Sequence, residues 1–204
     1  MRKESYALII LVTLIFSIPG CTEPYYSIEE NPVEEKEDTI PEHMTIIADT
    51  ANREIDRTDK MDVILDSNGS NTLIMWVSTG CSGCHDWTKE IAELMRNGTL
   101  DNDTRIITIH RYPAFESKDE VIEVYASENS STESLWPVLM PYDGQCVFDL
   151  DTGKLTDINY VDAFDNPATP SLTIIDGDGS IIWYNQTYWY NQSTLEHAIS
   201  ILNN

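Results

Sequence analysis

The hydrophobic pattern between residues 72 and 110 predicts a strand, a helix and a second strand. The continuous apolar run Thr72–Ser78 predicts a strand buried on both faces, because a half-exposed strand would alternate polar and apolar residues. Apolar side chains then recur at helical spacing, at Trp87, Ile91, Leu94 and Met95. Asn97-Gly98 ends this helix, and 105–110 is the second strand. Such a unit implies a right-handed crossover and parallel strands.

The other periodic segments continue the alternation of strands and helices. Further strands are predicted at 45–48, 146–150, 171–176 and 180–184, with a hairpin turn between the last two. The capping-box sequence that begins at Ser117 predicts a helix to about residue 126, and Ser193 caps an amphipathic last helix. Together these elements predict one α/β domain over residues 45–204, with a longer segment around 111–166.

Residues 1–21 have the pattern of an export signal. Arg2 and Lys3 precede an apolar run over 6–18, which is shorter than the roughly 20 residues of a membrane-spanning helix. The run ends Ile18-Pro19-Gly20-Cys21, which resembles the lipobox of bacterial and archaeal lipoproteins, although Pro19 departs from the usual small residue. We therefore expect either lipidation at Cys21 or an uncleaved anchor. In both cases the remainder of the chain lies on the extracytoplasmic face of the cell membrane.

The composition adds an acidic surface and a tether. The chain has 12 Lys and Arg against 35 Asp and Glu, a net charge of −23, so no nucleic-acid partner is expected. Residues 22–44 combine prolines with an acidic run and little periodicity, and they predict a flexible linker before the folded domain.

Asn-x-Ser/Thr sequons lie in or next to predicted turns, where exported proteins carry N-linked glycans. They begin at Asn68, Asn97, Asn102, Asn129, Asn185 and Asn191. These sequons favour a glycoprotein. The alternative is that Asn, Ser and Thr are simply common in turns.

The cysteines include one closely spaced pair. With Cys21 assigned to lipid, Cys81 and Cys84 form that pair and Cys146 remains, which is not the pattern of a disulfide-rich small domain. The sequence from Cys81 to His85 fits either a thiol–disulfide enzyme or c-type haem attachment. A strand leading into the motif, and no clear distal haem ligand on a later helix, disfavour haem. Cys146 is either a third redox cysteine or an inert core residue.

Two separated motifs resemble the thioredoxin-like superfamily. The first is the apolar strand that runs into Cys81-Ser82-Gly83-Cys84, and the second is 168–179 (ATPSLTIIDGDG), which is similar to the family's cis-proline loop, next strand and turn. The segment 125–144 is similar to exported members of the TlpA/ResA type, which are akin to peroxiredoxins of the AhpC/TSA type. The resemblance covers about residues 60–204. It implies a central mixed β-sheet flanked by helices and the activity of a thiol–disulfide oxidoreductase.

The resemblance also implies roles for individual residues. Cys81 would be the attacking thiolate, stabilised at a helix N-terminus, and Cys84 the resolving thiol that closes a Cys81–Cys84 disulfide. Thr169 and Pro170 would form the substrate-docking loop, with Pro170 in the cis form. The implied partners are exported protein thiols or disulfides and a membrane or extracytoplasmic electron-donor thiol protein. No cofactor and no metal are expected.

Two positions depart from the family pattern. Gly80 precedes the first cysteine, where many members have an aromatic residue, and Met75 stands where many have a buried acid that relays a proton. The proton of Cys84 therefore lacks its usual acceptor. His85 is the nearest titratable candidate to modulate that proton or the thiolate.

The sequence thus predicts a membrane-tethered thiol–disulfide oxidoreductase, and the resemblance favours a reductase. The main alternative is a thioredoxin-fold copper-binding module with two thiolates and a distant His110 or His197, although such modules usually space their cysteines by three residues. A peroxidase is disfavoured because Ile74 stands where the peroxidase motif has proline. A redox-inactive binding role stays open.

Overall fold

The computed structural model describes residues 39–128 and 130–203. The predicted signal segment 1–21 with Cys21, most of the predicted linker and the sequon at Asn129 lie outside these residues. The first strand begins at Met44, so the last residue of the predicted linker already belongs to the folded part. No helix within the described ranges is long and apolar enough to cross a membrane.

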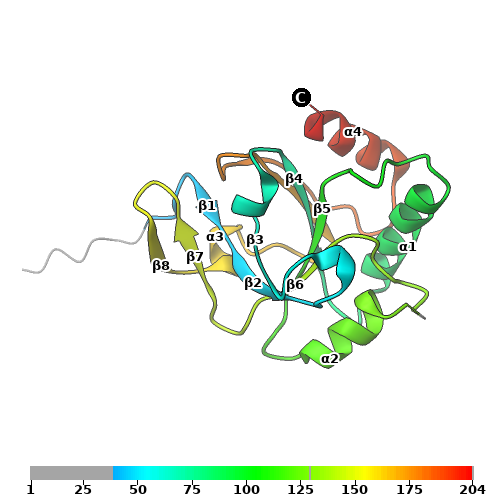
Figure 1. Ribbon diagram of the computed structural model, residues 1–204, viewed down its shortest axis with the longest axis horizontal. Helices are drawn as coiled ribbons and strands as arrows, with labels where there is room; N and C mark the ends of the chain where they lie inside the picture. The colour runs from blue at the N-terminus through cyan, green and yellow to red at the C-terminus, as the bar shows by residue number, and fades with distance from the viewer. Residues whose placement is uncertain (1–38, 129, 204) are drawn as a thin grey trace, which may run out of the picture. The chain divides into compact units, whose positions relative to one another are not determined.

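A mixed seven-stranded sheet forms the centre of the fold, in the order β10-β9-β4-β5-β6-β2-β3 (Figure 1). Its strands are β2 Ile47–Thr50, β3 Lys60–Asp62, β4 Thr72–Val77, β5 Ile106–His110, β6 Val138–Met140, β9 Ser171–Ile175 and β10 Ile181–Asn185. β5 is parallel to both β4 and β6, whereas β9 is antiparallel to both β4 and β10. Helix α1, Ser82–Arg96, connects β4 to β5, which confirms the predicted strand–helix–strand unit.

Successive residues of β4 face two different parts of the core. Leu73, Met75 and Val77 lie in the cluster that contains the buried faces of α1 and of α4, Gln192–Leu202. Ile74 and Trp76 lie in the second cluster, on the opposite face of the sheet. Because side chains alternate between two covered faces, β4 reads as a continuous apolar run.

Different elements cover the two faces of the sheet. Figure 1 shows α1, α4 and α2, Lys118–Val121, on one side. On the other side lie α3, Tyr160–Ala163, and a three-stranded antiparallel sheet in the order β1-β7-β8. Its strands are β1 Met44–Thr45, β7 Cys146–Asp149 and β8 Lys154–Asn159. At the carboxyl ends of β4 and β5 the chain continues into loops, which begin at Ser78 and Arg111.

Some predicted elements differ in extent from the observed ones. The single strand expected at 45–48 is divided between β1 and β2, which pair in different sheets. The helix expected from Ser117 consists of α2 followed by a π-helical turn, η3, Ile122–Ala126. Short elements without apolar periodicity were not predicted, namely η1 Glu54–Asp56, β3, η2 Leu65–Ser67, β8 and α3.

Candidate active site

Cys81 lies where the central strand β4 passes into helix α1. Three residues, Ser78 to Gly80, separate the end of β4 from Cys81, which is the N-cap residue of α1 with an extended backbone (φ −89°, ψ 102°). Its sulfur accepts a hydrogen bond from the backbone N–H of Cys84 at 3.1 Å. Free N–H groups and the helix dipole stabilise negative charge at such a position. The site therefore favours a thiolate at Cys81 when the pair is reduced.

Cys81 and Cys84 form a disulfide in the structure, with their Cα atoms 5.2 Å apart. The exposed fraction is 7% for Cys81 and 0% for Cys84, so an incoming group can reach only the first sulfur. Cys84 lies one helical turn behind it, against the carbonyl of Trp76. This asymmetry gives the two sulfurs different tasks, attack for Cys81 and resolution for Cys84.

The Thr169–Pro170 loop lies beside this disulfide-bearing junction. The antiparallel pairing of β4 with β9 sets Trp76 opposite Ser171, so the residues just before Ser171 lie next to the end of β4. The peptide bond between Thr169 and Pro170 is cis, and the hydroxyls of Ser78 and Thr169 lie 3.5 Å apart. Pro170 has no N–H and is buried, whereas Thr169 is half-buried. Two segments about 90 residues apart are thus brought together.

His85 is fixed by the loop that precedes the cysteines. Its Nε2 lies 2.7 Å from the carbonyl oxygen of Thr79, and because a carbonyl only accepts, Nε2 carries the proton. The ring also meets Tyr125 edge-on, with centroids 5.8 Å apart. The structure therefore places His85 against the Thr79 carbonyl, whereas the hydrogen bond to the Cys81 sulfur comes from the N–H of Cys84.

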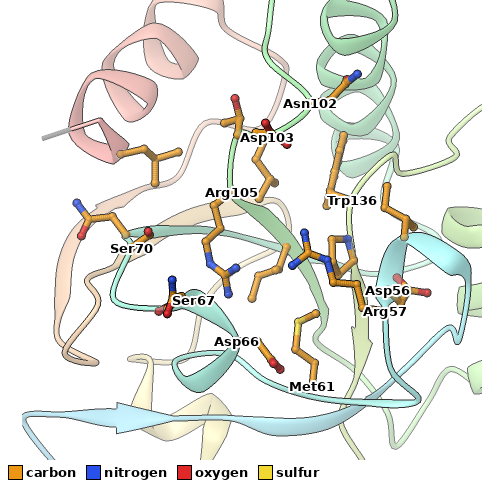
Figure 2. Close-up of a pocket in the computed structure, with 18 of the residues that line it drawn as sticks. Asp56, Arg57, Met61, Asp66, Ser67, Ser70, Asn102, Asp103, Arg105 and Trp136 are labelled. Atoms are coloured by element: carbon orange, nitrogen blue, oxygen red, sulfur yellow. The ribbon is translucent and has the colours of Figure 1, made fainter.

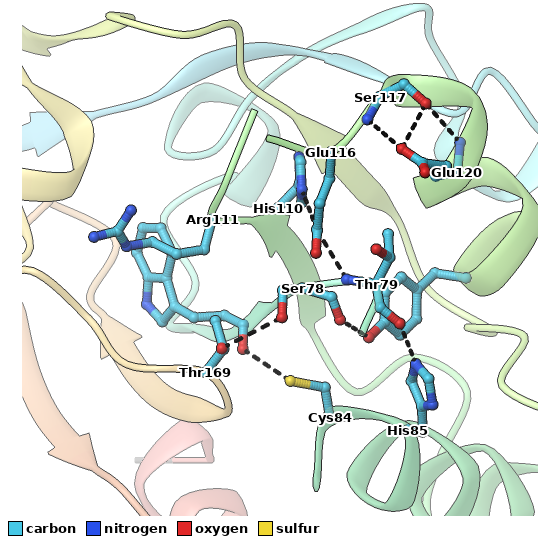
Figure 3. A network of polar contacts seen from close by, with 12 residues as sticks. Ser78, Thr79, Cys84, His85, His110, Arg111, Glu116, Ser117, Glu120 and Thr169 are labelled. Atoms are coloured by element: carbon cyan, nitrogen blue, oxygen red, sulfur yellow. Dashed lines mark hydrogen bonds and ion pairs between the residues drawn. The ribbon is translucent and has the colours of Figure 1, made fainter. Parts of the chain in front are cut away.

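Three further residues hold the same loop, a role that the sequence did not predict; His110 was considered there only as a copper ligand. Tyr125 donates its hydroxyl to the carbonyl of Ser78 at 2.6 Å, and the Glu116 carboxylate accepts from the N–H of Thr79 at 2.9 Å. His110 lies 2.8 Å from the same carboxylate oxygen. Figure 3 shows Glu116 and His110 beside Ser78 and Thr79. Of the three, only His110 has a position in the sequence that points to the site, because it ends a strand that runs parallel to β4.

Burial and hydrogen bonding fix the charge states of these groups. Burial raises the pKa of Tyr125, so its hydroxyl stays protonated and donates. Burial lowers the pKa of His110 even though Glu116 raises it, so the imidazole favours its neutral form. For Glu116, burial raises the pKa, but the hydrogen bonds from Thr79 and His110 outweigh it and lower the pKa overall. Glu116 is therefore an anion that accepts two N–H groups.

Gly83, between the two cysteines, is buried under the segment that connects β10 to α4. A Cβ at Gly83 would lie 2.3 Å from the carbonyl oxygen of Tyr188. The same segment is tied to α1 by two hydrogen bonds, from the indole of Trp87 to the Thr187 carbonyl (2.8 Å) and from the N–H of Tyr190 to Asp86 (2.9 Å). The small size of Gly83 is required by this close backbone contact.

Cys146 does not take part in the disulfide. It lies in β7, in the second sheet, as a half-buried free thiol whose sulfur is 3.6 Å from the carbonyl of Gly144. The Cys81–Cys84 pair closes without it, and the role of Cys146 as a third redox cysteine stays a prediction.

The haem and copper alternatives gain no support from the geometry. Cys81 and Cys84 are bonded to each other, and His85 is bound to Thr79. His110 is engaged by Glu116, and the ring of His197 lies edge-on against Trp183 on another part of the fold. Within residues 39–128 and 130–203, no three His, Cys, Asp or Glu side chains gather as metal ligands.

A cavity of about 460 Å³ lies away from the cysteines (Figure 2). Asn71 and Arg105, next to the amino ends of β4 and β5, line it, whereas Cys81 follows the carboxyl end of β4. The Arg105 guanidinium is held by the Thr72 hydroxyl at 2.7 Å and by the Val63 carbonyl at 3.1 Å. The cavity is thus separated from the disulfide by the length of a strand.

Comparison with known proteins identifies the fold. No family model matches the sequence, and no curated protein matches it. A solved thioredoxin-like superfamily protein matches with 17% identity and a TM-score of 0.52, over 80% of this chain and 96% of that one. A thiol:disulfide interchange protein of the thioredoxin family from Chlorobium tepidum matches with 9% identity and a TM-score of 0.52, over 81% and 98%. A thiol-disulfide oxidoreductase from Bacteroides fragilis matches with 10% identity and a TM-score of 0.51, over 78% and 97%.

At these identities the similarity establishes the fold. The chain has a thioredoxin-like fold, with a central mixed sheet flanked by helices, and this prediction from the sequence is confirmed.

Proposed function

We propose that this chain is a membrane-tethered, extracytoplasmic thiol–disulfide oxidoreductase that cycles Cys81 and Cys84 on exported proteins, and that it works as a reductase. The observation that carries the proposal is the Cys81–Cys84 disulfide at the N-cap of α1, beside the Thr169–Pro170 loop. Two of the structural neighbours are named for thiol–disulfide interchange or oxidoreduction. The same chemistry fits the sulfur geometry of this chain.

The proposed reaction transfers two electrons from the dithiol to a client disulfide. The Cys81 thiolate attacks one client sulfur, a mixed disulfide forms, and the other client sulfur leaves as a thiolate that takes up a proton. Cys84 then loses its proton and attacks the Cys81 sulfur. The Cys81–Cys84 disulfide forms, and the second client sulfur leaves as a thiol. A thiol donor protein on the same side of the membrane reduces the pair again.

Thr169 and Pro170 are proposed to dock the client chain during this exchange. They lie next to Ser78, at the end of the strand that leads into Cys81. Pro170 cannot donate a hydrogen bond, so this edge of the site does not compete for the attacking sulfur. The half-buried Thr169 is the part of the loop that an extended client segment can contact.

The proposed location rests on the amino-terminal pattern and on the sequons. Residues 1–21 read as an export signal with Cys21 as the lipid acceptor, and an uncleaved anchor is the other route to a tether. Of the five sequon asparagines within the described ranges, four are exposed and Asn185 is half-buried. Exposed acceptors agree with glycan attachment on an exported protein.

Variants of the cysteines test the chemistry. Cys81→Ser should abolish reduction of a model disulfide protein such as insulin. Cys84→Ser should accumulate a mixed disulfide at Cys81, visible by non-reducing electrophoresis and mass spectrometry. Cys146→Ser is the matched control and should keep the activity. Full activity of Cys81→Ser would refute the assignment, and the equilibrium of the pair with glutathione would establish whether reduction is the favoured direction.

A separate experiment tests the tether. Protein recovered from membranes after native expression should begin at Cys21 and carry the mass of its lipid, and Cys21→Ser should release it. An intact amino terminus in the membrane-bound form would support the uncleaved anchor instead. A mass decrease after deglycosylation would identify the sequons in use.

A further inference from the structure

We propose that Glu116, held by His110, is a positioning residue that fixes the Thr79 peptide and thereby the geometry and reactivity of Cys81. This inference rests on the proposed thiol–disulfide chemistry of Cys81. It goes beyond that chemistry because Glu116 and His110 lie outside the CxxC motif and exchange no electrons.

Glu116 contacts the segment 78–80, which connects β4 to Cys81. Its Ser78 carbonyl accepts from Tyr125 and also from the N–H of Cys81, at 2.6 and 3.3 Å. The Ser78–Thr79 peptide group is thus held at its carbonyl by Tyr125 and at its N–H by Glu116. His85 holds the carbonyl of Thr79, which belongs to the next peptide group. A peptide that is held in this way sets the direction in which the chain enters the N-cap of α1.

Glu116 itself is held rigidly enough to serve as an anchor. A turn in the preceding loop, with the N–H of Glu116 bonded to the carbonyl of Tyr112 at 3.0 Å, folds the residue back over the end of β5. There its oxygen Oε2 accepts from Thr79 and from His110, so one oxygen takes both bonds. His110 is 1% exposed and its place is set by pairing with Val77 in β4.

The charged and titratable groups around this peptide come from four elements. His85 belongs to α1, His110 to β5, and Tyr125 to η3, while Glu116 and the more distant Glu120 lie just before and within α2. Within the described residues, the Cys81 sulfur accepts its hydrogen bond from the N–H of Cys84 and not from any of these groups. Glu116 therefore acts through the Thr79 peptide rather than by exchanging a proton with sulfur.

Two substitutions separate the position of the acceptor oxygen from its charge. Glu116→Gln keeps an oxygen that can accept from both Thr79 and His110 but removes the negative charge. Glu116→Ala removes both. Glu123→Ala, an exposed carboxylate in η3, is the matched control.

The measurements are the pH dependence of Cys81 alkylation in the reduced protein and the equilibrium of the pair with glutathione. Glu116→Ala should change the alkylation rate or the equilibrium constant by about tenfold, which corresponds to the loss of one ordinary intramolecular hydrogen bond. Glu116→Gln and Glu123→Ala should stay close to the unsubstituted protein. Circular dichroism and thermal unfolding would establish that each variant is folded.

Two results would overturn the positioning role. Equal shifts in Glu116→Gln and Glu116→Ala would mean that the charge matters, and no shift in Glu116→Ala would mean that the peptide is held without this residue. Both measurements need only the two thiols and not a client protein. Failure of insulin reduction would therefore count against the proposed function alone, while the effect of Glu116 would still be measured.

Discussion

The α-carbon of Gly83 faces the carbonyl oxygen of Tyr188 so closely that a Cβ at this position would lie 2.3 Å from it. The contact joins the CxxC motif to the connection between β10 and α4. It explains why a glycine stands inside a helix, where it otherwise costs about 0.5–1 kcal/mol relative to alanine. The segment cannot move away freely, because Trp87 and Asp86 bind it on either side of the contact.

Gly83→Ala should therefore destabilise the oxidised protein, despite the higher helix propensity of alanine. The expected loss is about 1–3 kcal/mol in the free energy of unfolding, as for other overpacked sites. Denaturant unfolding would measure it. Gly80→Ala is the control, because a Cβ there meets nothing within 4 Å, and its effect should stay within about 0.5 kcal/mol. Equal stability of Gly83→Ala and the parent chain would contradict the close contact.

Tyr125→Phe should weaken the hold on the loop before Cys81. The substitution removes the buried hydrogen bond to the Ser78 carbonyl, and the expected cost is about 1–2 kcal/mol in the free energy of unfolding. Tyr142→Phe, at an exposed tyrosine, is the matched control and should be neutral. If the two variants unfold at the same denaturant concentration, the bond contributes nothing and the loop is held by its other contacts.

The parts of the fold that the sequence predicted are those with a local signature. The continuous run of β4, the helix after it and the strand from Ser171 are each marked by several adjacent residues. The junction that carries Cys81 and Cys84 is marked in the same way. The exposed strand β8 has no apolar alternation, and it owes its place to pairing with β7.

The residues that hold the Thr79 loop could not be predicted from local sequence patterns. Glu116, His110 and Tyr125 come from a loop, a strand end and a π-helical turn, and each looks like an ordinary polar or aromatic residue in its own segment. Tyr125 and Glu116 bind the Ser78–Thr79 peptide group, and His110 binds Glu116. A backbone peptide group as the shared partner leaves no mark in the sequence. Only the three-dimensional pairing of β4 with β5 brings them together.

The reduced protein should not retain copper(I) in the presence of a competing thiol. In the alternative function, a thioredoxin-fold copper-binding module, two thiolates and a histidine would bind the soft copper(I) ion. Here His110 is committed to Glu116 and His197 belongs to α4. A copper titration of the reduced protein with excess glutathione would measure retention, with Cys84→Ser as the control. Stoichiometric retention that is lost in Cys84→Ser would revive the metal-binding function.

His110 links the candidate site to the stability of the fold at low pH. Its ring is buried at the end of β5, and burial lowers its pKa below the ordinary value of 6.5 despite the neighbouring Glu116. Below that ordinary value the unfolded chain binds a proton that the folded chain resists. Stability at this site is therefore complete above about pH 6.5, the ordinary pKa, and is lost progressively as the pH falls toward the folded pKa.

His110→Gln should remove this pH dependence while keeping the anchor. A glutamine amide can donate to the Glu116 carboxylate as Nε2 of His110 does, but it does not titrate. The two proteins should have similar free energies of unfolding above pH 7. As the pH falls from 6.5 toward 5, the unsubstituted protein should lose stability relative to His110→Gln, with a slope of at most about 1.4 kcal/mol per pH unit for one proton. Urea unfolding at a series of pH values measures the difference, and contributions from the half-buried His43 cancel in it. Parallel stability curves would show that His110 accepts its proton as readily in the folded chain as in the unfolded one.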